Sequence, residues 1–297
     1  SNIVFFDEIH LLLFRKGPFI KKYSSNIVKF KFMNQVGILG CGWLGVGLAE
    51  KLTSDSFGLK VSRTSLESIA ELKAKGWDAH QIFVANSSVQ GNLEFFENLD
   101  QLIVSIPPGR ANSSGYFEKI SSLLKHLKSY PRCRIIFLSS TSVYGKKGGV
   151  YNESSSVFPE TEAAKALVQS ERLIVNSPHS SLVVRLGGLI GADRNPIFSL
   201  YKKLIPNPNG RINFISKEDA VLGLFQLIKH TALEGIFNIV HPHHPTRREY
   251  YLKMATKYEL PTPNFKDDEP AVERFIQATK IEFESEFRYT VDNLLID

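Results

Sequence analysis

The sequence predicts an α/β protein built on a doubly wound parallel sheet, with a smaller C-terminal lobe for the substrate. Three observations predict this fold. Short apolar segments alternate regularly with amphipathic helical segments between residues 35 and 186. A glycine-rich turn joins the first apolar segment to the first helix. After residue 187 the chain becomes rich in Gly, Asn and Pro, as is typical of loops that cover a cleft.

The elements of the predicted sheet follow one another in a strict order. Strands are expected at Gln35–Leu39, Leu59–Arg63, His80–Val84, Gln101–Ile106, Arg134–Leu138 and Ser181–Leu186. The helices between them are expected at Leu44–Thr53, Leu66–Lys75, Tyr116–Lys128 and Glu162–Asn176. Ser65 has the hydroxyl that caps a helix N-terminus, and Gly76 can end the same helix.

The C-terminal part is predicted to form a smaller lobe over the carboxyl ends of the strands. Its short strands are expected at Ile212–Ile215 and Ile236–Val240, and its helices at Ser216–His230, Tyr250–Tyr258 and Glu269–Thr279. We therefore expect a sheet domain at residues 33–191 and an intertwined substrate lobe at residues 192–297. Residues 1–32 precede the periodic pattern and are interpreted as an appended leader, or alternatively as a helix packed on the surface.

Gly40, Gly42 and Gly45 follow the first strand with the spacing Gly-x-Gly-x-x-Gly, and Trp43 and Leu44 lie between the last two. The first glycine permits a tight turn, the second lets a pyrophosphate approach the backbone, and the third lets the helix pack on the strand. The helix N-terminus then offers free N–H groups to an anion. The pattern predicts a Rossmann-type dinucleotide site. An ordinary tight turn is the alternative, although it does not need three spaced glycines.

The end of the second strand indicates which dinucleotide is bound. Enzymes that use NAD usually place Asp or Glu here, on the ribose hydroxyls. This chain has Ser62, Arg63 and Thr64 instead. No carboxylate repels a 2′-phosphate, and Arg63 can pair with one. The residues favour NADP over NAD, and the alternative is a solvated arginine at a strand end.

Composition excludes several other classes of protein. With 297 residues, 43% of them hydrophobic, the chain can bury a large core. Its two cysteines favour a reducing cytoplasm over a disulfide framework, and no apolar run is long enough to span a membrane. The net charge is +6, but residues 1–32 carry six basic and two acidic residues. The nearly neutral remainder predicts no nucleic-acid partner. We expect a small-molecule substrate and a monomer or homodimer.

A second segment carries a resemblance to a known family. The segment Ser139–Gly145 reads Ser-Ser-Thr-Ser-Val-Tyr-Gly after the fifth predicted strand. Together with the glycine loop, it resembles the extended short-chain dehydrogenase/reductase family, which includes NAD(P)-dependent epimerases and dehydratases. The resemblance places Ser140 on the catalytic Ser/Thr, whose hydroxyl hydrogen-bonds the reacting oxygen. It also implies that Pro107, at the end of the fourth strand, contacts the cofactor. The alternative for the turn is a polar loop with Tyr144 packed into the wall.

The resemblance departs from the family at the acid/base residue. The Tyr-x-x-x-Lys motif aligns its tyrosine with Thr161 and its lysine with Lys165. A threonine hydroxyl is too weak an acid to exchange a proton near neutral pH. Lys165 is implied to hold the ribose and assist catalysis. Tyr144 and Tyr151 are the nearest phenols in the sequence. The resemblance places Tyr144 at the border of the substrate pocket, where it could replace the tyrosine in catalysis or, alternatively, support the loop. The pattern resembles atypical members that have lost the tyrosine, and the Gly-Trp-Leu-Gly form resembles a bacterial subgroup described only as epimerase-like.

Three functions follow from these patterns. The leading hypothesis is a reductase or epimerase that uses NADP on a polar, nucleotide-linked substrate. The second is a sensor that holds NADP without turnover. The third is a β-hydroxyacid dehydrogenase-like enzyme, supported by the glycine loop and by the segment Ile103–Pro108, but that class needs an all-helical C-terminal region. No metal is expected, because His241, His243 and His244 lie in a proline-flanked turn with no Cys or carboxylate at ligand spacing.

Overall fold

The computed structural model describes residues 34–109, 115–268 and 270–295. The chain divides into two units, residues 1–32 and residues 33–297. The predicted leader lies outside the described residues. The second unit contains both the predicted sheet domain and the predicted C-terminal lobe.

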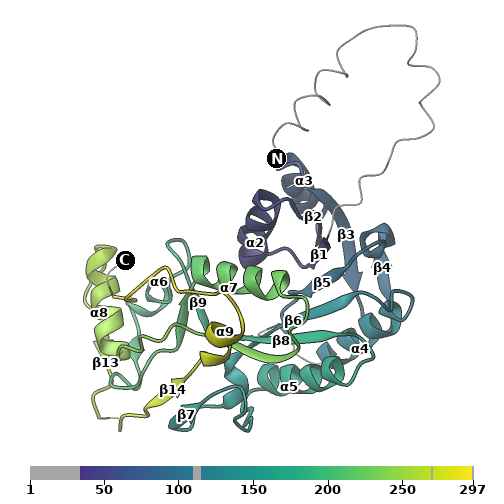
Figure 1. The fold of residues 1–297 in the computed structure, drawn as a ribbon. Coiled ribbons are helices and arrows are strands. Elements are labelled where there is room, and N and C mark those ends of the chain that lie inside the picture. Colours follow the sequence, from purple (N-terminus) through teal and green to yellow (C-terminus); the bar gives the residue numbers. More distant parts are fainter. Residues whose placement is uncertain (1–33, 110–114, 269, 296–297) are drawn as a thin grey trace, which may run out of the picture. The chain divides into compact units, whose positions relative to one another are not determined.

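The main sheet has eight strands in the order β12-β8-β6-β5-β1-β2-β3-β4 (Figure 1). Every neighbouring pair is parallel except β3 and β4, which are antiparallel. The order reverses at β1, and doubly wound sheets bind ligands at this switch point. The strands are β1 (Gln35–Leu39), β2 (Gly58–Arg63), β3 (Asp78–Val84), β4 (Val89–Gly91), β5 (Gln101–Val104), β6 (Arg134–Ser140), β8 (Ser181–Leu186) and β12 (Gly235–Ile239).

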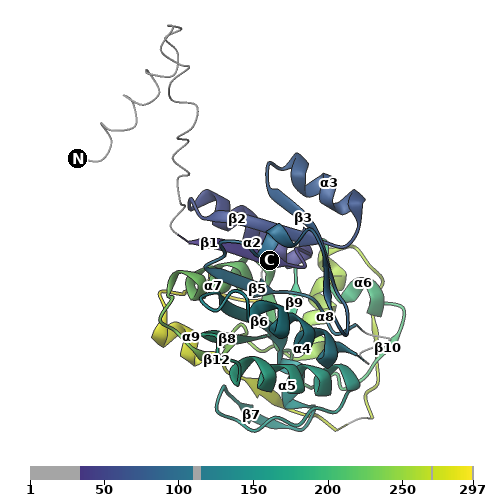
Figure 2. The same ribbon diagram turned by 90° about the vertical axis from the view of Figure 1, so that its right-hand side faces the viewer.

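Helices cover both faces of this sheet (Figures 1 and 2). On one face α2 (Trp43–Ser54) packs on α7 (Lys217–Lys229), and on the other α4 (Tyr116–Leu127) packs on α5 (Glu162–Val175). Helix α3 (Leu66–Ala74) packs against β2 and β3. Ser65 caps α3 as predicted, because its Oγ accepts the N–H of Ser68 at 3.2 Å. The central strands are almost fully buried, which is why they are nearly continuous apolar runs.

A second, smaller apolar cluster forms the core of the C-terminal lobe and includes Ile197, Tyr250 and Met254. The lobe is built from short elements: β9 (Gly188–Ile190), α6 (Ile197–Leu200), β10 (Leu204–Ile205), β11 (Phe214–Ser216), α8 (Arg247–Lys257) and β13 (Asn264–Phe265). Residues after 191 also supply α7 and β12 to the main layers. The two predicted domains therefore share elements.

The helix predicted over Glu269–Thr279 is wrong. In the described part of this segment, β14 (Arg274–Ile276) pairs with β7 (Gly149–Tyr151), and α9 (Thr279–Glu284) begins only at its end. A distant side chain fixes this strand. The amide of Asn213 donates to the Arg274 carbonyl at 2.9 Å and accepts the Ile276 N–H at 2.8 Å. This tertiary contact overrides the local helical pattern.

Within the part of the chain that the structure describes, no helix combines the length and the apolar composition needed to cross a bilayer.

Candidate functional site

A cleft of about 670 Å³ lies at the carboxyl ends of the central strands, where the strand order reverses. One wall comes from the glycine loop, the end of β2 and the end of β3, and the other from the end of β6 and from α5. The segment that follows β5 lies between them, and Pro107 is part of it. Leu189 and Arg194 of the C-terminal lobe complete the lining. The predicted cofactor residues Gly40, Gly42, Trp43, Leu44, Ser62, Arg63, Thr64 and Pro107 all line this cleft.

The three glycines of the loop have three different surroundings. Gly40 has a φ of +85°, and a Cβ there would lie 2.9 Å from the Ile106 side chain. A Cβ on Gly45 would meet Ile38 at 3.4 Å, so this residue, which does not line the cleft, serves helix–strand packing. A Cβ on Gly42 would meet nothing nearer than the Gly40 carbonyl oxygen at 3.8 Å. Packing in the protein therefore does not require glycine at position 42, whereas close approach of a ligand does.

The helix that begins behind Gly42 is arranged to receive an anion. Gly42 is the N-cap of α2, and no side chain caps the free N–H groups there. The first turn of α2 also has no acidic residue. The positive end of the helix dipole is thus uncompensated where it meets the cleft.

Arg63 lies at the end of β2 with hydrogen-bonding capacity to spare. Its Nε is buried and has no hydrogen-bond partner among the described residues. A buried guanidinium nitrogen without a partner is costly. The side chain also lines the cleft, so the guanidinium can meet an acceptor there. The neighbouring Ser62 is used internally, because its Oγ accepts the Gly40 N–H at 3.1 Å and so holds the glycine turn to β2.

The charge of the cleft is uniformly positive. Arg63, Lys119 and Arg194 line it, and no carboxylate is among the described lining residues. Lys119 and Arg194 were not predicted from the sequence. Arg194 lies in the Gly-, Asn- and Pro-rich stretch that was expected to cover the cleft. The composition of that stretch could therefore have indicated Arg194 as a cleft residue. Lys119 is a half-buried residue of α4, and no motif in the sequence around it gave a signal.

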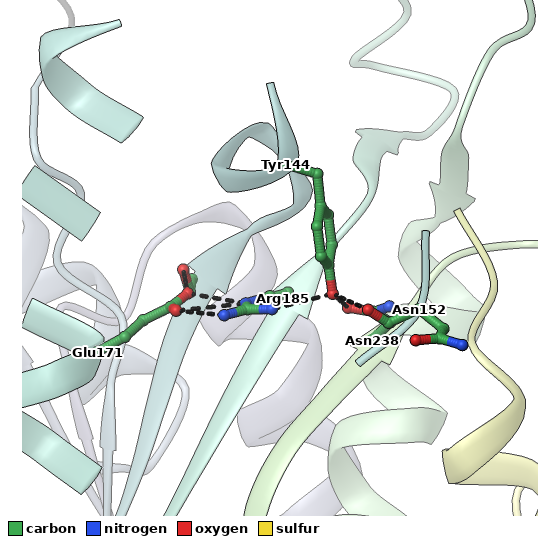
Figure 3. A network of polar contacts seen from close by, with 6 residues as sticks. Tyr144, Asn152, Glu171, Arg185 and Asn238 are labelled. Atoms are coloured by element: carbon green, nitrogen blue, oxygen red, sulfur yellow. Dashed lines mark hydrogen bonds and ion pairs between the residues drawn. The ribbon is translucent and has the colours of Figure 1, made fainter. Parts of the chain in front are cut away.

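A buried polar network lies beneath the Ser139–Gly145 turn (Figure 3). Arg185 pairs with both carboxylate oxygens of Glu171, at 2.7 Å from Nη2 and 3.1 Å from Nε, and each side chain is at most 5% exposed. Ser139 Oγ donates to Glu171 at 2.5 Å. The network fastens the turn to α5 and β8. Ser140, the next residue, lines the cleft, and its Oγ accepts the Ser142 N–H at 3.2 Å, which leaves the hydroxyl proton free to donate.

Tyr144 belongs to this network. Its ring is fully buried and does not line the cleft. The hydroxyl accepts a hydrogen bond from Arg185 at 3.0 Å and lies 2.9 Å from the Asn152 carbonyl and from Asn238 Oδ1. Burial raises the pKa of this phenol, although Arg185 acts in the opposite direction. The catalytic role predicted for Tyr144 is therefore not supported, and the geometry favours loop support.

The start of α5 does not supply a substitute for the missing tyrosine. Thr161 Oγ1 caps the helix by accepting the Ala164 N–H at 3.1 Å. Lys165 is exposed, does not line the cleft, and pairs with Glu162 at 2.8 Å. The predicted catalytic and cofactor-binding roles of Lys165 are not supported, because the side chain forms a surface pair one turn along its own helix.

The histidine turn is structural. His241 Nε2 lies 2.6 Å from the Val291 carbonyl, and its Nδ1 accepts the His243 N–H at 3.0 Å. His244 Nδ1 lies 3.0 Å from the Ile212 carbonyl. Within the ranges that the structure covers, no group of three His, Cys, Asp or Glu side chains could hold a metal ion.

The chain is similar in sequence or in structure to several known proteins. No family model matches the chain. Protein YeeZ of Escherichia coli is 28% identical over 270 residues, which cover 89% of this chain and 98% of that protein. A functionally unknown conserved protein from Silicibacter pomeroyi has a TM-score of 0.72 at 18% identity, covering 89% of this chain and 96% of that one.

Two enzymes of known activity are also similar in structure. UDP-glucuronic acid 4-epimerase from Bacillus cereus, solved in complex with NAD, has a TM-score of 0.73 at 15% identity, covering 88% of this chain and 95% of that one. The dTDP-glucose 4,6-dehydratase from Bacillus anthracis, also solved with NAD, has a TM-score of 0.69 at 14% identity, covering 88% and 94%. The strands β11 and β12 count against the β-hydroxyacid dehydrogenase hypothesis, which needs an all-helical C-terminal region. The chain thus has the Rossmann-type fold of epimerase and dehydratase enzymes.

Proposed function

We propose that this protein binds NADP in the central cleft and is an atypical member of the extended short-chain dehydrogenase/reductase family. Two features of the cleft support this proposal most directly, the glycine loop and Arg63. Gly42 leaves space that only a ligand needs, and Arg63 has a buried nitrogen without a partner. The similar enzymes solved with NAD support a nicotinamide dinucleotide as the ligand.

The residues of the cleft fit this cofactor part by part. The Gly40–Leu44 loop and the α2 N-terminus would hold the diphosphate. Arg63 would pair with the 2′-phosphate that distinguishes NADP from NAD. When bound, the nicotinamide supplies a hydride donor or acceptor. Ser140 keeps a free hydroxyl proton at the cleft, which can hydrogen-bond the oxygen of a reacting carbonyl or alcohol.

We infer a reductase or epimerase acting on a polar, nucleotide-linked small molecule in the cytoplasm. Support for this substrate class comes from the positive cleft and from the nucleotide-sugar enzymes of the same fold. We expect the protein to act as a monomer or homodimer, without a nucleic-acid or membrane partner.

One observation favours a second candidate function, a sensor that binds NADP without turnover. The two residues at the Tyr-x-x-x-Lys positions, and the phenol considered as a substitute, are all used otherwise. Thr161 caps a helix, Lys165 pairs on the surface, and Tyr144 is locked in the buried network. Oxidation or reduction of the cofactor in a panel of nucleotide sugars would favour the enzyme. Stoichiometric binding with no redox change in any of them would favour the sensor.

Calorimetric titration with NADP and NAD tests the proposal. We expect Arg63→Ala to weaken NADP binding roughly ten- to a hundredfold, the effect of losing a charge-assisted hydrogen bond, and to change NAD binding less than about twofold. Arg172→Ala removes an exposed arginine outside the cleft and serves as the matched control. Equal losses for both cofactors would mean that Arg63 does not bind the 2′-phosphate.

A further inference from the structure

A turn of the C-terminal lobe is fastened to the glycine loop by Trp43. The indole Nε1 donates to the carboxylate of Asp193, at 2.8 and 3.0 Å from its two oxygens. Gly191 lies against the same ring, and a Cβ there would come within 2.7 Å of Trp43 Cζ2. Backbone hydrogen bonds between Gly191 and Arg194, at 3.0 and 3.1 Å, close the turn. The contact joins residues 150 positions apart in the sequence.

The same turn presents a free cation to the cleft. Arg194 is exposed, lines the cleft, and has its guanidinium carbon 5.1 Å from the centre of the Trp43 ring. The adjacent carboxylate, Asp193, is engaged by the indole. No described carboxylate lies within ion-pair distance of Arg194, so its charge is available to a ligand. A cation–π contact with an aromatic ring helps to hold a guanidinium in place while its donors stay free.

The position of Trp43 indicates which part of a ligand Arg194 would meet. Trp43 is the first residue of α2 and directly follows Gly42. Arg194 therefore lies beside the helix N-terminus where the proposed function places the diphosphate, whereas Arg63 lies at the end of β2. A planar guanidinium can donate two parallel hydrogen bonds to phosphate oxygens.

We propose that Arg194 binds the diphosphate of the dinucleotide from the C-terminal lobe, and that Trp43 and Asp193 are its positioning residues. The inference rests on the proposed function and adds a residue to it. Cofactor binding would then join the two lobes across the diphosphate. The chain would use separate arginines for separate phosphates, Arg194 for the diphosphate and Arg63 for the 2′-phosphate.

Two fragments of the cofactor separate these roles. ADP-ribose contains the diphosphate but no 2′-phosphate, and 2′-AMP contains the 2′-phosphate but no diphosphate. We expect Arg194→Gln to weaken ADP-ribose binding roughly ten- to fiftyfold in calorimetry and to change 2′-AMP binding less than about twofold. Arg63→Ala should show the reverse pattern. Arg172→Gln, on an exposed arginine outside the cleft, should change neither.

The positioning role has its own readout. Trp43→Phe keeps an aromatic ring but removes the N–H that engages Asp193. We expect Trp43→Phe to lose less ADP-ribose affinity than Arg194→Gln does. The double variant should bind ADP-ribose no more weakly than Arg194→Gln alone. Arg194→Lys keeps the charge but loses the planar fork, so its affinity should lie between those of the wild type and Arg194→Gln.

Three outcomes would overturn the inference. Wild-type affinity of a folded Arg194→Gln variant for ADP-ribose would remove Arg194 from the diphosphate site. Unchanged ADP-ribose affinity with weakened binding of UDP would assign Arg194 to the substrate instead. A wild-type protein that binds neither ADP-ribose nor NADP would refute the proposed function itself, a result distinct from the first two.

Discussion

The two walls of the cleft differ in how their polar groups are used. On the wall formed by the glycine loop and the end of β2, Gly42 opens onto free space and Arg63 keeps an unpartnered nitrogen. On the opposite wall, Ser139 is committed to a buried network. Behind that wall, Tyr144 belongs to the same network and Thr161 caps a helix, and neither lines the cleft. The first wall is arranged for a ligand, and the second mostly for the protein itself. Under the proposed function, cofactor binding and proton transfer are therefore separable, and the residues proposed for the first are free for a ligand more completely than those expected for the second.

Breaking the buried ion pair should have the largest effect on stability. Glu171→Ala leaves the Arg185 guanidinium buried and without its carboxylate. We expect a loss of about 3–5 kcal/mol in the free energy of unfolding, measured by urea denaturation. The double variant Glu171→Leu/Arg185→Met removes both charges and should be much closer to the wild type. A loss below about 1 kcal/mol for the single variant would show that the network does not hold this wall together.

The sequence predicted the residues that line the first wall, because the features of that wall are local. The glycine spacing, the preceding strand and the residues at the end of β2 all lie between Gln35 and Thr64. The opposite wall depends on contacts between distant segments, such as the hydrogen bond that Tyr144 accepts from Arg185. The pairing of Trp43 with Asp193 is also invisible in a single sequence. Strand β14 was mispredicted for the same reason, because the side chain of Asn213 fixes it.

The pH dependence of stability should come from outside the cleft, because the described residues that line the cleft include no histidine. Burial, the largest cause, lowers the pKa of both His243 and His244 in the C-terminal lobe below the usual 6.5. The folded state therefore binds their protons less tightly than the unfolded state does. The contribution of these two histidines to stability should be constant above about pH 6.5 and should fall as the pH drops from there towards the lowered pKa values.

Thermal unfolding at pH 7.5, 6.5 and 5.5 would measure this loss. Since both side chains are partly exposed, we expect only a modest decrease in melting temperature at the lowest pH. Replacing both histidines with asparagine should make the decrease smaller. A decrease of the same size in that variant would show that other groups cause it.

The smallest effect is expected at Lys165, where the sequence predicted a large one. The side chain is exposed and paired with Glu162, so Lys165→Ala should change NADP affinity less than about twofold. Fluorescence titration would measure the affinity, with Arg63→Ala as the variant that should lose it. A tenfold loss for Lys165→Ala would mean that the lysine turns into the cleft when the cofactor binds, and the two walls would then differ less than we infer.

We infer that the open space at Gly42 exists for a dinucleotide. Calorimetric titration of NADP into the wild type and into Gly42→Val tests it most directly. Because the backbone at Gly42 is extended and a Cβ there has room, the variant should fold, with only the small loss of stability that valine causes at a helix N-cap. We predict that the wild type binds NADP and that the folded variant does not, since the side chain would occupy the place of the phosphates. Equal NADP binding by both proteins would show that the space at Gly42 is not the place of the phosphates.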